Sequence, residues 1–188
     1  VKKGRRVTYL KDERALNSYL IDRAIDSVTL RGTEGREVSG EELRELIKTL
    51  LGFQNSLDRL ERRNDARILR EVLHVGVELE DLRNEDVLEA KMQEVLERLQ
   101  ERYTTTKWEA PEIRPNEDVE ELYDAVWSTR VAGSSITTRI DRSQLQLHDF
   151  KELVRIWGEV SALGLPVTVD AGQDEPESYF EPDSLLNA

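Results

Sequence analysis

Histidine and cysteine, two residue types that enzymes often use at catalytic and metal centres, are scarce or missing in this chain. It has two histidines, His74 and His148, and no cysteine. A catalytic zinc site usually takes three protein ligands, so we expect neither histidine to bind metal and place His74 near a helix end. The sequence also has no G-x-S-x-G elbow, no G-x-x-x-x-G-K-[ST] loop and no G-x-G-x-x-G turn. We therefore predict no catalytic, cofactor-binding or metal-binding residue in this chain.

The segment ELEDLRNED (78–86) is dense in carboxylates. Carboxylates bind Mg²⁺ or transfer protons when several of them converge in a cleft. We instead expect a solvated loop here, followed by the start of a helix.

The segment LDRLERRNDARILR (57–70) is the one basic run inside the chain. Arginine forks can bind a phosphate or the carboxylates of a partner. They can also pair within the chain with Asp58, Glu61 and Glu71, and we favour this second interpretation while keeping the first open. The candidate contact residues of the run are Arg59, Arg62, Arg63, Arg67 and Arg70.

Helical elements that would position this run fill the first half of the sequence. Apolar residues at helical spacing predict helices over about 12–25 and from Ser39 to about Arg62. A short helix capped by Asn64 or Asp65 should end at Gly76, and Asn84 should cap a third long helix. The residues expected on the buried faces of these helices are Leu43, Leu46, Ile47, Leu50, Phe53, Leu57, Leu60, Ile68, Leu69, Val72, Leu73, Leu88, Met92, Val95 and Leu99.

Strands are predicted mainly in the second half of the sequence. SVTLR (27–31) reads as an early short strand, GTEG (32–35) as a turn, and SSITTRID (134–141) alternates as a half-buried antiparallel strand does. A last helix over about 147–163 should bury Phe150, Leu153, Val154, Trp157 and Val160, before a strand at 166–171. The class is therefore α+β: a helix-rich first half, then antiparallel strands with one packed helix. Trp108, Trp127 and Trp157 are expected in the core.

Charge argues against autonomous DNA binding. The net charge of the 188-residue chain is −12 and its mean hydropathy is −0.60, whereas binding to nucleic-acid phosphates needs a basic surface. No apolar run is long enough for a membrane span, so we expect no membrane partner. The four bases of the first ten residues, which are further candidates for a partner or DNA contact, are Lys2, Lys3, Arg5 and Arg6.

The opening VKKGRRVTYLKDERAL begins without Met and alternates like a strand. We expect it to be frayed or to pair with the C-terminal strand, and its own sheet to lie upstream in a larger protein. This opening resembles the stretch after the catalytic carboxylates in the Toprim domain of the B subunit of bacterial DNA gyrase. NSLDRLERRNDARILREVL (55–73) and the order of the later elements resemble the large insertion in that domain, which occurs in Gram-negative bacteria.

This resemblance implies three parts: the end of a Toprim strand with a lead-in helix (1–26), the insertion domain (27–172) and an acidic return segment (173–188). It implies a cytoplasmic parent that supercoils DNA negatively with ATP and Mg²⁺, in a heterotetramer of two A and two B subunits. The expected partners are the rest of the gyrase B chain, the gyrase A chain and, through the parent, DNA. No catalytic residue or cofactor of the parent is carried over to this chain, which alone should be an inactive block that buttresses the DNA gate.

Two alternatives remain open. The chain could be a free-standing acidic interaction protein, an adaptor or a DNA mimic, whose negative surface occupies a nucleic-acid-binding site. A hydrolase that uses the acidic loops is the other alternative, and activity with added Mg²⁺ and no partner would support it.

Overall fold

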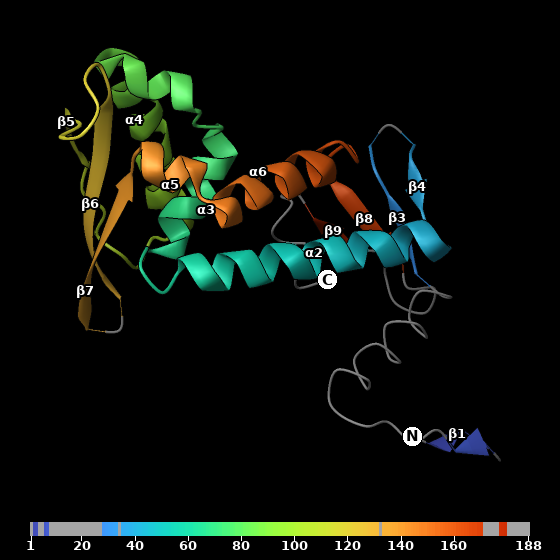
Figure 1. The fold of residues 1–188 in the computed structure, drawn as a ribbon. Helices are drawn as coiled ribbons and strands as arrows, with labels where there is room; N and C mark the ends of the chain where they lie inside the picture. The colour runs from blue at the N-terminus through green and yellow to red at the C-terminus, as the bar shows by residue number, and fades with distance from the viewer. Residues whose placement is uncertain are drawn as a thin grey trace. The chain divides into compact units, whose positions relative to one another are not determined.

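A computed structural model of the chain describes residues 2–3, 6–7, 28–33, 35–131, 133–170 and 177–179. The chain divides into two units, which are described separately. The first comprises residues 1–52 with 158–188, and the second comprises residues 53–157. Each combines helical segments with antiparallel strands (Figure 1), so the α+β prediction is confirmed.

The first unit contains a four-stranded antiparallel sheet in the order β4-β3-β8-β9. The early strand and the strand after the last helix were both predicted, but their pairing with each other was not. Arg31 ties three of these strands together, since its guanidinium donates to Glu37 at 2.9 Å and to Asp170 at 3.0 Å. The strands are β3 Thr29–Arg31, β4 Glu37–Val38, β8 Val167–Asp170 and β9 Glu177–Tyr179.

A glycine permits the close approach of two chain segments in this unit. The GTEG turn follows β3, with the Gly35 N–H donating to the Gly32 carbonyl at 3.1 Å, as predicted. A Cβ on Gly32 would lie 1.8 Å from the carbonyl oxygen of Leu163. The neighbouring Thr33 N–H donates to the Gly164 carbonyl at 3.1 Å. Only a residue without a side chain fits at position 32.

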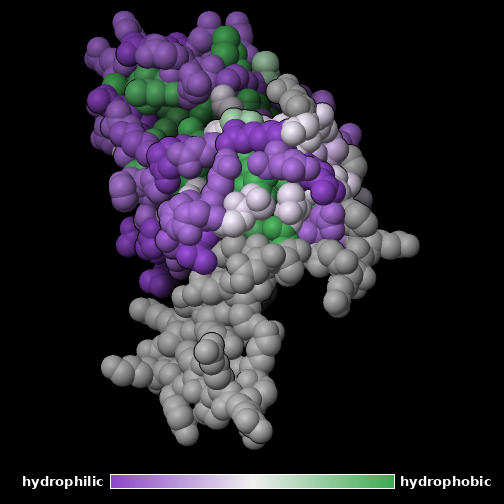
Figure 2. All heavy atoms as spheres, turned by 90° about the vertical axis from the view of Figure 1, so that its right-hand side faces the viewer, coloured by the Kyte–Doolittle hydropathy of each residue, from purple (hydrophilic) through white to green (hydrophobic). Residues whose placement is uncertain are grey.

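Helix α2 (Gly40–Leu60) begins just after Ser39 and ends two residues before the predicted end. Leu43 in the first unit and Phe53, Leu57 and Leu60 in the second are buried, as the spacing predicted. The other three predicted positions, Leu46, Ile47 and Leu50, are half-buried. On the face shown in Figure 2, hydrophilic side chains cover most of the coloured surface, with hydrophobic areas between them.

The helices of the second unit have caps that the sequence predicted. Asp65 accepts from the Arg67 N–H at 3.1 Å, and Gly76 closes the helix in the left-handed conformation at φ 67°. Asn84 accepts from the Val87 N–H at 3.2 Å at the start of the third long helix. All eight predicted core positions of these two α-helices are buried. The helices are α3 Ala66–Val75, the 3₁₀ helix η1 Leu79–Arg83 and α4 Glu85–Arg102.

The second unit also contains the antiparallel sheet β5-β6-β7, on which α4 packs. Trp108 and Trp127 are buried, as predicted, and Thr138 and Ile140 face inward from the predicted 134–141 strand. The strands are β5 Glu112–Pro115, β6 Tyr123–Val131 and β7 Ser134–Ile140. A short helix that was not predicted, α5 (Arg142–Gln146), follows β7.

The structure corrects several expectations, among them the solvated loop at 78–86, where Leu79–Arg83 form η1, and leaves others outside the described residues. In α6 (His148–Ser161), Val154 is 49% exposed and Ile156 is buried in its place, because the buried face follows the 150, 153, 156 and 160 positions; Trp157 is half-buried. The first strand segment (β1, Lys2–Lys3) pairs with β2 (Arg6–Val7), so the expected pairing with the C-terminal strand was wrong for these residues. The predicted helix at 12–25, Arg5 and most of the acidic 173–188 segment lie outside the described residues.

We predict that Gly32→Ala lowers the free energy of unfolding of the first unit by about 1–3 kcal/mol, because the new methyl group would overlap the Leu163 carbonyl. The matched control is Gly158→Ala in α6, where a Cβ meets nothing within 4 Å. It should stabilise the chain by up to about 1 kcal/mol. Urea denaturation followed by circular dichroism measures both changes. A Gly32→Ala variant as stable as the unsubstituted chain would contradict the close approach of Gly32 to the Leu163 carbonyl.

Candidate functional site

The basic run of the sequence lies at the end of α2, the following turn and the start of α3. Within it, Arg59 is tied to an acid from α6. Its Nε and Nη2 donate to Oδ1 of Asp149 at 2.9 and 2.6 Å, and Nη2 also donates to Ser56 Oγ. The hydrogen bond from Arg59 holds the pKa of the Asp149 carboxyl below its ordinary value.

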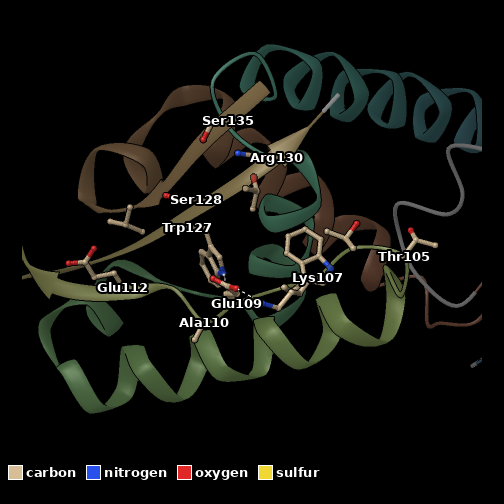
Figure 3. A pocket seen from close by; sticks show the side chains of 13 residues that line it. Thr105, Lys107, Glu109, Ala110, Glu112, Trp127, Ser128, Arg130 and Ser135 are labelled. Carbon is tan, nitrogen blue, oxygen red and sulfur yellow. Dashed lines mark hydrogen bonds and ion pairs between the residues drawn. The ribbon is translucent and has the colours of Figure 1, made fainter. Parts of the chain in front are cut away.

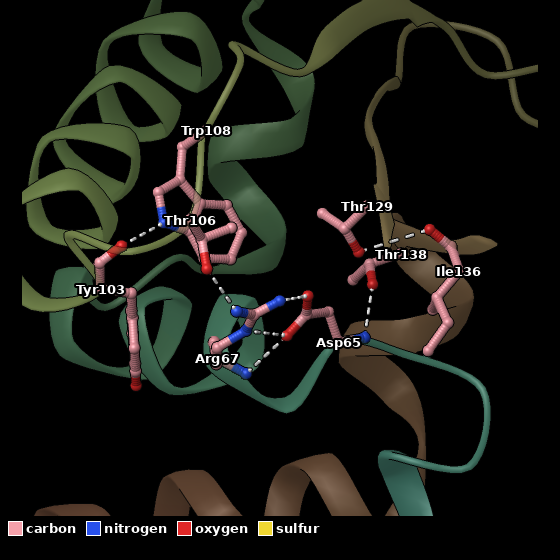
Figure 4. A network of polar contacts seen from close by, with 8 residues as sticks. All are labelled: Asp65, Arg67, Tyr103, Thr106, Trp108, Thr129, Ile136 and Thr138. Carbon is pink, nitrogen blue, oxygen red and sulfur yellow. Dashed lines mark hydrogen bonds and ion pairs between the residues drawn. The ribbon is translucent and has the colours of Figure 1, made fainter. Parts of the chain in front are cut away.

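Arg67 is the centre of a second network, drawn in Figure 4. Its guanidinium forms a fork on Asp65, with Nε to Oδ1 at 2.9 Å and Nη2 to Oδ2 at 2.7 Å. Its Nη1 donates to Thr106 Oγ1 at 3.0 Å, and the guanidinium carbon lies 4.5 Å from the centroid of the Trp108 ring. Arg67 thereby joins the start of α3 to the segment that precedes β5.

The Asp65 carboxylate is almost completely buried, with 2% of its side chain exposed. Burial opposes its ionisation, but the hydrogen bonds and charge of Arg67, together with a hydrogen bond from Thr129, outweigh burial and hold the pKa of Asp65 below the ordinary value. The Asp65 N–H donates to Thr138 Oγ1 in β7 at 2.7 Å. Asp65 therefore connects the start of α3, where it pairs with Arg67, to the sheet.

The remaining arginines of the run differ in exposure. Arg62 and Arg63 lie in the turn between α2 and α3, are exposed, and form no ion pair with any residue that the structure describes. Arg70 is half-buried. Internal pairing, the favoured interpretation, thus holds for Arg59 and Arg67, although with Asp149 and Asp65 rather than with the predicted acids.

A third ion-pair cluster joins α3 to α4. The Glu71 side chain is fully buried and accepts from Arg98 Nε at 2.8 Å and from Arg102 Nη1 at 3.2 Å. Lys91, which also lies on α4, donates to the Gly76 carbonyl and pairs with Asp81, both at 2.7 Å. Each base of α4 therefore pairs with an acid of another element of the unit, and Arg102 remains partly exposed.

The exposed residues of α4 are mostly acidic. Lys91, Arg98 and Arg102 pair with acids on other elements of the unit, and of these three bases only Arg102 is among the exposed residues of the helix. The exposed acids are Glu85, Asp86, Glu89, Glu94, Glu97 and Glu101.

The structure also contains a groove that the sequence did not predict. It has a volume of about 740 Å³ and lies between two segments, 105–110 with Glu112 on one side and 126–130 with Ser135 on the other (Figure 3). The only signal for it in the sequence was the pair of tryptophans, Trp108 and Trp127, which we assigned to the core alone.

The two histidines do not come together. His74 lies in the last turn of α3, as expected, and packs edge-on against Trp157 with the ring centroids 4.3 Å apart, whereas His148 is exposed at the start of α6. In the described ranges, no three His, Asp or Glu side chains gather as they would around a metal ion. Nor does any described helix have the length and apolar character needed to cross a membrane.

Comparison with known proteins places the chain in a family. A family model described as the DNA gyrase B subunit insert domain matches residues 30–163. The chain belongs to the DNA gyrase B subunit insert domain family. The resemblance seen in the arginine-rich segment is thereby confirmed at the level of the family, whereas the opening lies outside the matched residues.

Known relatives of this insert domain agree with the family match. The DNA gyrase B subunit of Rickettsia felis is 34% identical over 116 residues, which is 58% of this chain and 14% of that protein. The same gyrase chain of Myxococcus xanthus is 33% identical over 69 residues, covering 37% of this chain and 8% of that protein. The DNA gyrase B subunit of Caulobacter vibrioides is 28% identical over 75 residues, which is 40% of this chain and 9% of that protein. The chain therefore spans about a seventh of the length of the first of these relatives.

We predict that removing the charge of Asp65 destabilises the insert domain in a pH-dependent way. Asp65→Asn keeps a good N-cap residue but loses the charged partner of Arg67, which should lower the free energy of unfolding by about 2 kcal/mol at pH 7. Because the pKa of Asp65 is lowered in the folded state, this contribution is complete above about pH 5 and fades as the pH falls through the folded-state pKa.

Urea denaturation of both proteins between pH 7 and pH 3 measures this difference. The gap between them should narrow at acidic pH. The control is Asp58→Asn, an exposed acid on α2 that bonds to Gln54 and lies outside the network. A gap that is constant with pH would contradict the role of the Asp65 charge.

Proposed function

We propose that the chain is a non-catalytic insertion domain that buttresses the DNA gate of a type II topoisomerase, DNA gyrase. The observation that carries the proposal is the family match over residues 30–163. The proposed parent supercoils DNA negatively with ATP and Mg²⁺ in the cytoplasm, as two A and two B subunits. The proposed partners are the Toprim domain of the gyrase B chain, the gyrase A chain and the DNA held by the parent.

Internal ion pairs suit a buttress. Glu71 with two arginines of α4 and Arg59 with Asp149 join helices that are distant in the sequence, and Asp65, paired with Arg67 beside it, donates its N–H to Thr138 in β7. A block held in this way can fix the position of a neighbouring surface before DNA binds. Binding then loses less conformational entropy, because fewer side chains and loops have to be ordered. Such a contribution changes affinity and coupling without a catalytic residue.

Two charged surfaces would act differently on DNA. The exposed acids of α4 would repel phosphates and keep DNA on its path. Arg62 and Arg63, in the exposed turn, would contact Toprim, the gyrase A chain or DNA, because their guanidinium groups have no acidic partner among the described residues. The family match favours this account over a free-standing adaptor.

The direct test is to replace residues 27–172 in the parent gyrase B chain with a short Gly-Ser linker. We expect DNA affinity and supercoiling to fall by about tenfold or more, equivalent to at least about 1.4 kcal/mol of lost interaction. ATP hydrolysis without DNA is the control and should persist, since the proposed role lies at the DNA gate. Unchanged DNA binding and supercoiling would refute the buttress.

A finer test reverses the charge of the exposed turn in the intact parent. Arg62→Glu with Arg63→Glu should weaken DNA binding or assembly of the heterotetramer about three- to tenfold, since each exposed contact contributes up to about 1 kcal/mol. The matched control is Arg142→Glu, an exposed arginine at the start of α5 that forms no ion pair with the described residues. Equal effects of the two changes would argue against a specific contact at the turn.

A further inference from the structure

Strand β6 is longer than its neighbour β5, and this leaves part of one edge open. β5 pairs with β6 from Glu112 opposite Val126 to Pro115 opposite Tyr123. On the other side, β7 pairs with β6 along its whole further length, from Ala125 to Val131. Residues 127–131 of β6 therefore have a strand on the β7 side only, and the groove lies along the other side.

The backbone groups on this open edge belong to Ser128 and Arg130. In an antiparallel pair, alternate residues direct both N–H and C=O to the same neighbour. The Leu122 carbonyl accepts from the Asn116 N–H at 2.8 Å, which directs the even-numbered residues of β6 toward the β5 side. Among the described residues, no backbone hydrogen bond reaches Ser128 or Arg130 from that side. Two donors and two acceptors of a strand ladder thus face the groove.

The segment before β5 is held away from this edge. If β5 continued in register, Ala110 would lie opposite Ser128, but Pro111 restricts the residue before it. The indole N–H of Trp127 donates to the Glu109 carbonyl at 3.1 Å, and that of Trp108 donates to the Tyr103 carbonyl at 3.3 Å. Pairing this segment with β6 would require these contacts to break and the buried Trp108 to leave its place beside Arg67.

We propose that this groove binds one extended segment of a partner protein, which adds as a strand beside Ser128 and Arg130 and directs a carboxylate side chain toward Arg130. The added strand would take up the four unpaired backbone groups, and main-chain hydrogen bonds supply the affinity in such strand addition. Arg130 is exposed and forms no ion pair with the described residues, so a cross-strand carboxylate is its complement. The proposal does not depend on the gyrase function proposed above.

Other occupants fit less well. Single-stranded nucleic acid needs a basic groove with exposed aromatic rings. In this groove the two bases Lys107 and Arg130 are matched in number by Glu109 and Glu112, and Trp108 and Trp127 are buried. A second copy of the chain would be repelled, because both copies carry a net charge of −12. It would also have to bring a folded sheet edge past the 105–110 wall, which a single extended segment need not do.

The probe is a phage-displayed library of random 12-residue peptides, selected on the 188-residue chain. We expect the enriched peptides to share an extended, proline-free core that contains Asp or Glu. Titration calorimetry would then measure the binding of one synthetic peptide to four variants of the chain.

Ser128→Pro removes the N–H that faces the groove without removing a hydrogen bond to β7, although its ring also restricts the backbone at positions 127 and 128, and it should weaken peptide binding about tenfold or more. Ser128→Val keeps that N–H and should bind within about twofold. Arg130→Glu should weaken binding of the acidic peptide to a similar degree, and Arg142→Glu should not. Thermal unfolding verifies that each variant is folded. If Ser128→Pro does not fold, slowed hydrogen exchange of the Ser128 and Arg130 amides in the bound state replaces it as the measurement.

The proposal is overturned if selection enriches no binding peptide, or if binding is insensitive to Arg130→Glu and leaves those two amides unprotected. Tighter binding of a 12-nucleotide single-stranded DNA than of the selected peptide, lost in Arg130→Glu, would assign the groove to nucleic acid instead.

Discussion

The second unit depends on one buried carboxylate, that of Asp65. Its oxygens cap α3 and form a fork with Arg67, while its own N–H reaches Thr138 in β7. Arg67 extends the connection to Thr106 and to the face of Trp108. A buried charge is costly unless it is paired and hydrogen-bonded. The geometry of α3, the sheet and the 105–110 segment must therefore be satisfied together, and this coupling also forms one wall of the groove.

The distribution of charge follows from the same demand for pairing. Glu71 is fully buried and takes up two arginines of α4, and Arg59 is held by Asp149. These pairs direct the bases of α4 to acids on other elements, although Arg59 and Arg102 remain partly exposed. The exposed acids of α4 and the ion pairs that join its bases to α3 and η1 are therefore two results of one arrangement.

Local signals in the sequence predicted most of the elements. Asp65, Gly76 and Asn84 mark helix ends because caps involve neighbours within a few residues, and the structure confirms all three. The prediction that Val154 is buried was wrong. Leu153 and Val154 are adjacent apolar residues that fit the helical period equally well, and only the packing of α6 determines that Leu153 is the buried one. The partners of Arg59, the pairing of β3 with β8 and the groove each join distant residues. The spacing of residues along the chain does not predict such contacts.

An open strand edge is usually a hazard, since it can pair with another copy and begin aggregation. Here the edge is short, has an arginine at its end, and lies behind a wall that two indole hydrogen bonds hold in place. Pro111 precedes the neighbouring strand β5 and Pro115 is its last residue, which limits the outer edge of β5 as a template. These features select by shape: a folded sheet is blocked by the wall, whereas a single extended segment can enter between wall and strand. The arrangement that protects the chain from its own copies is therefore the one that leaves room for a partner.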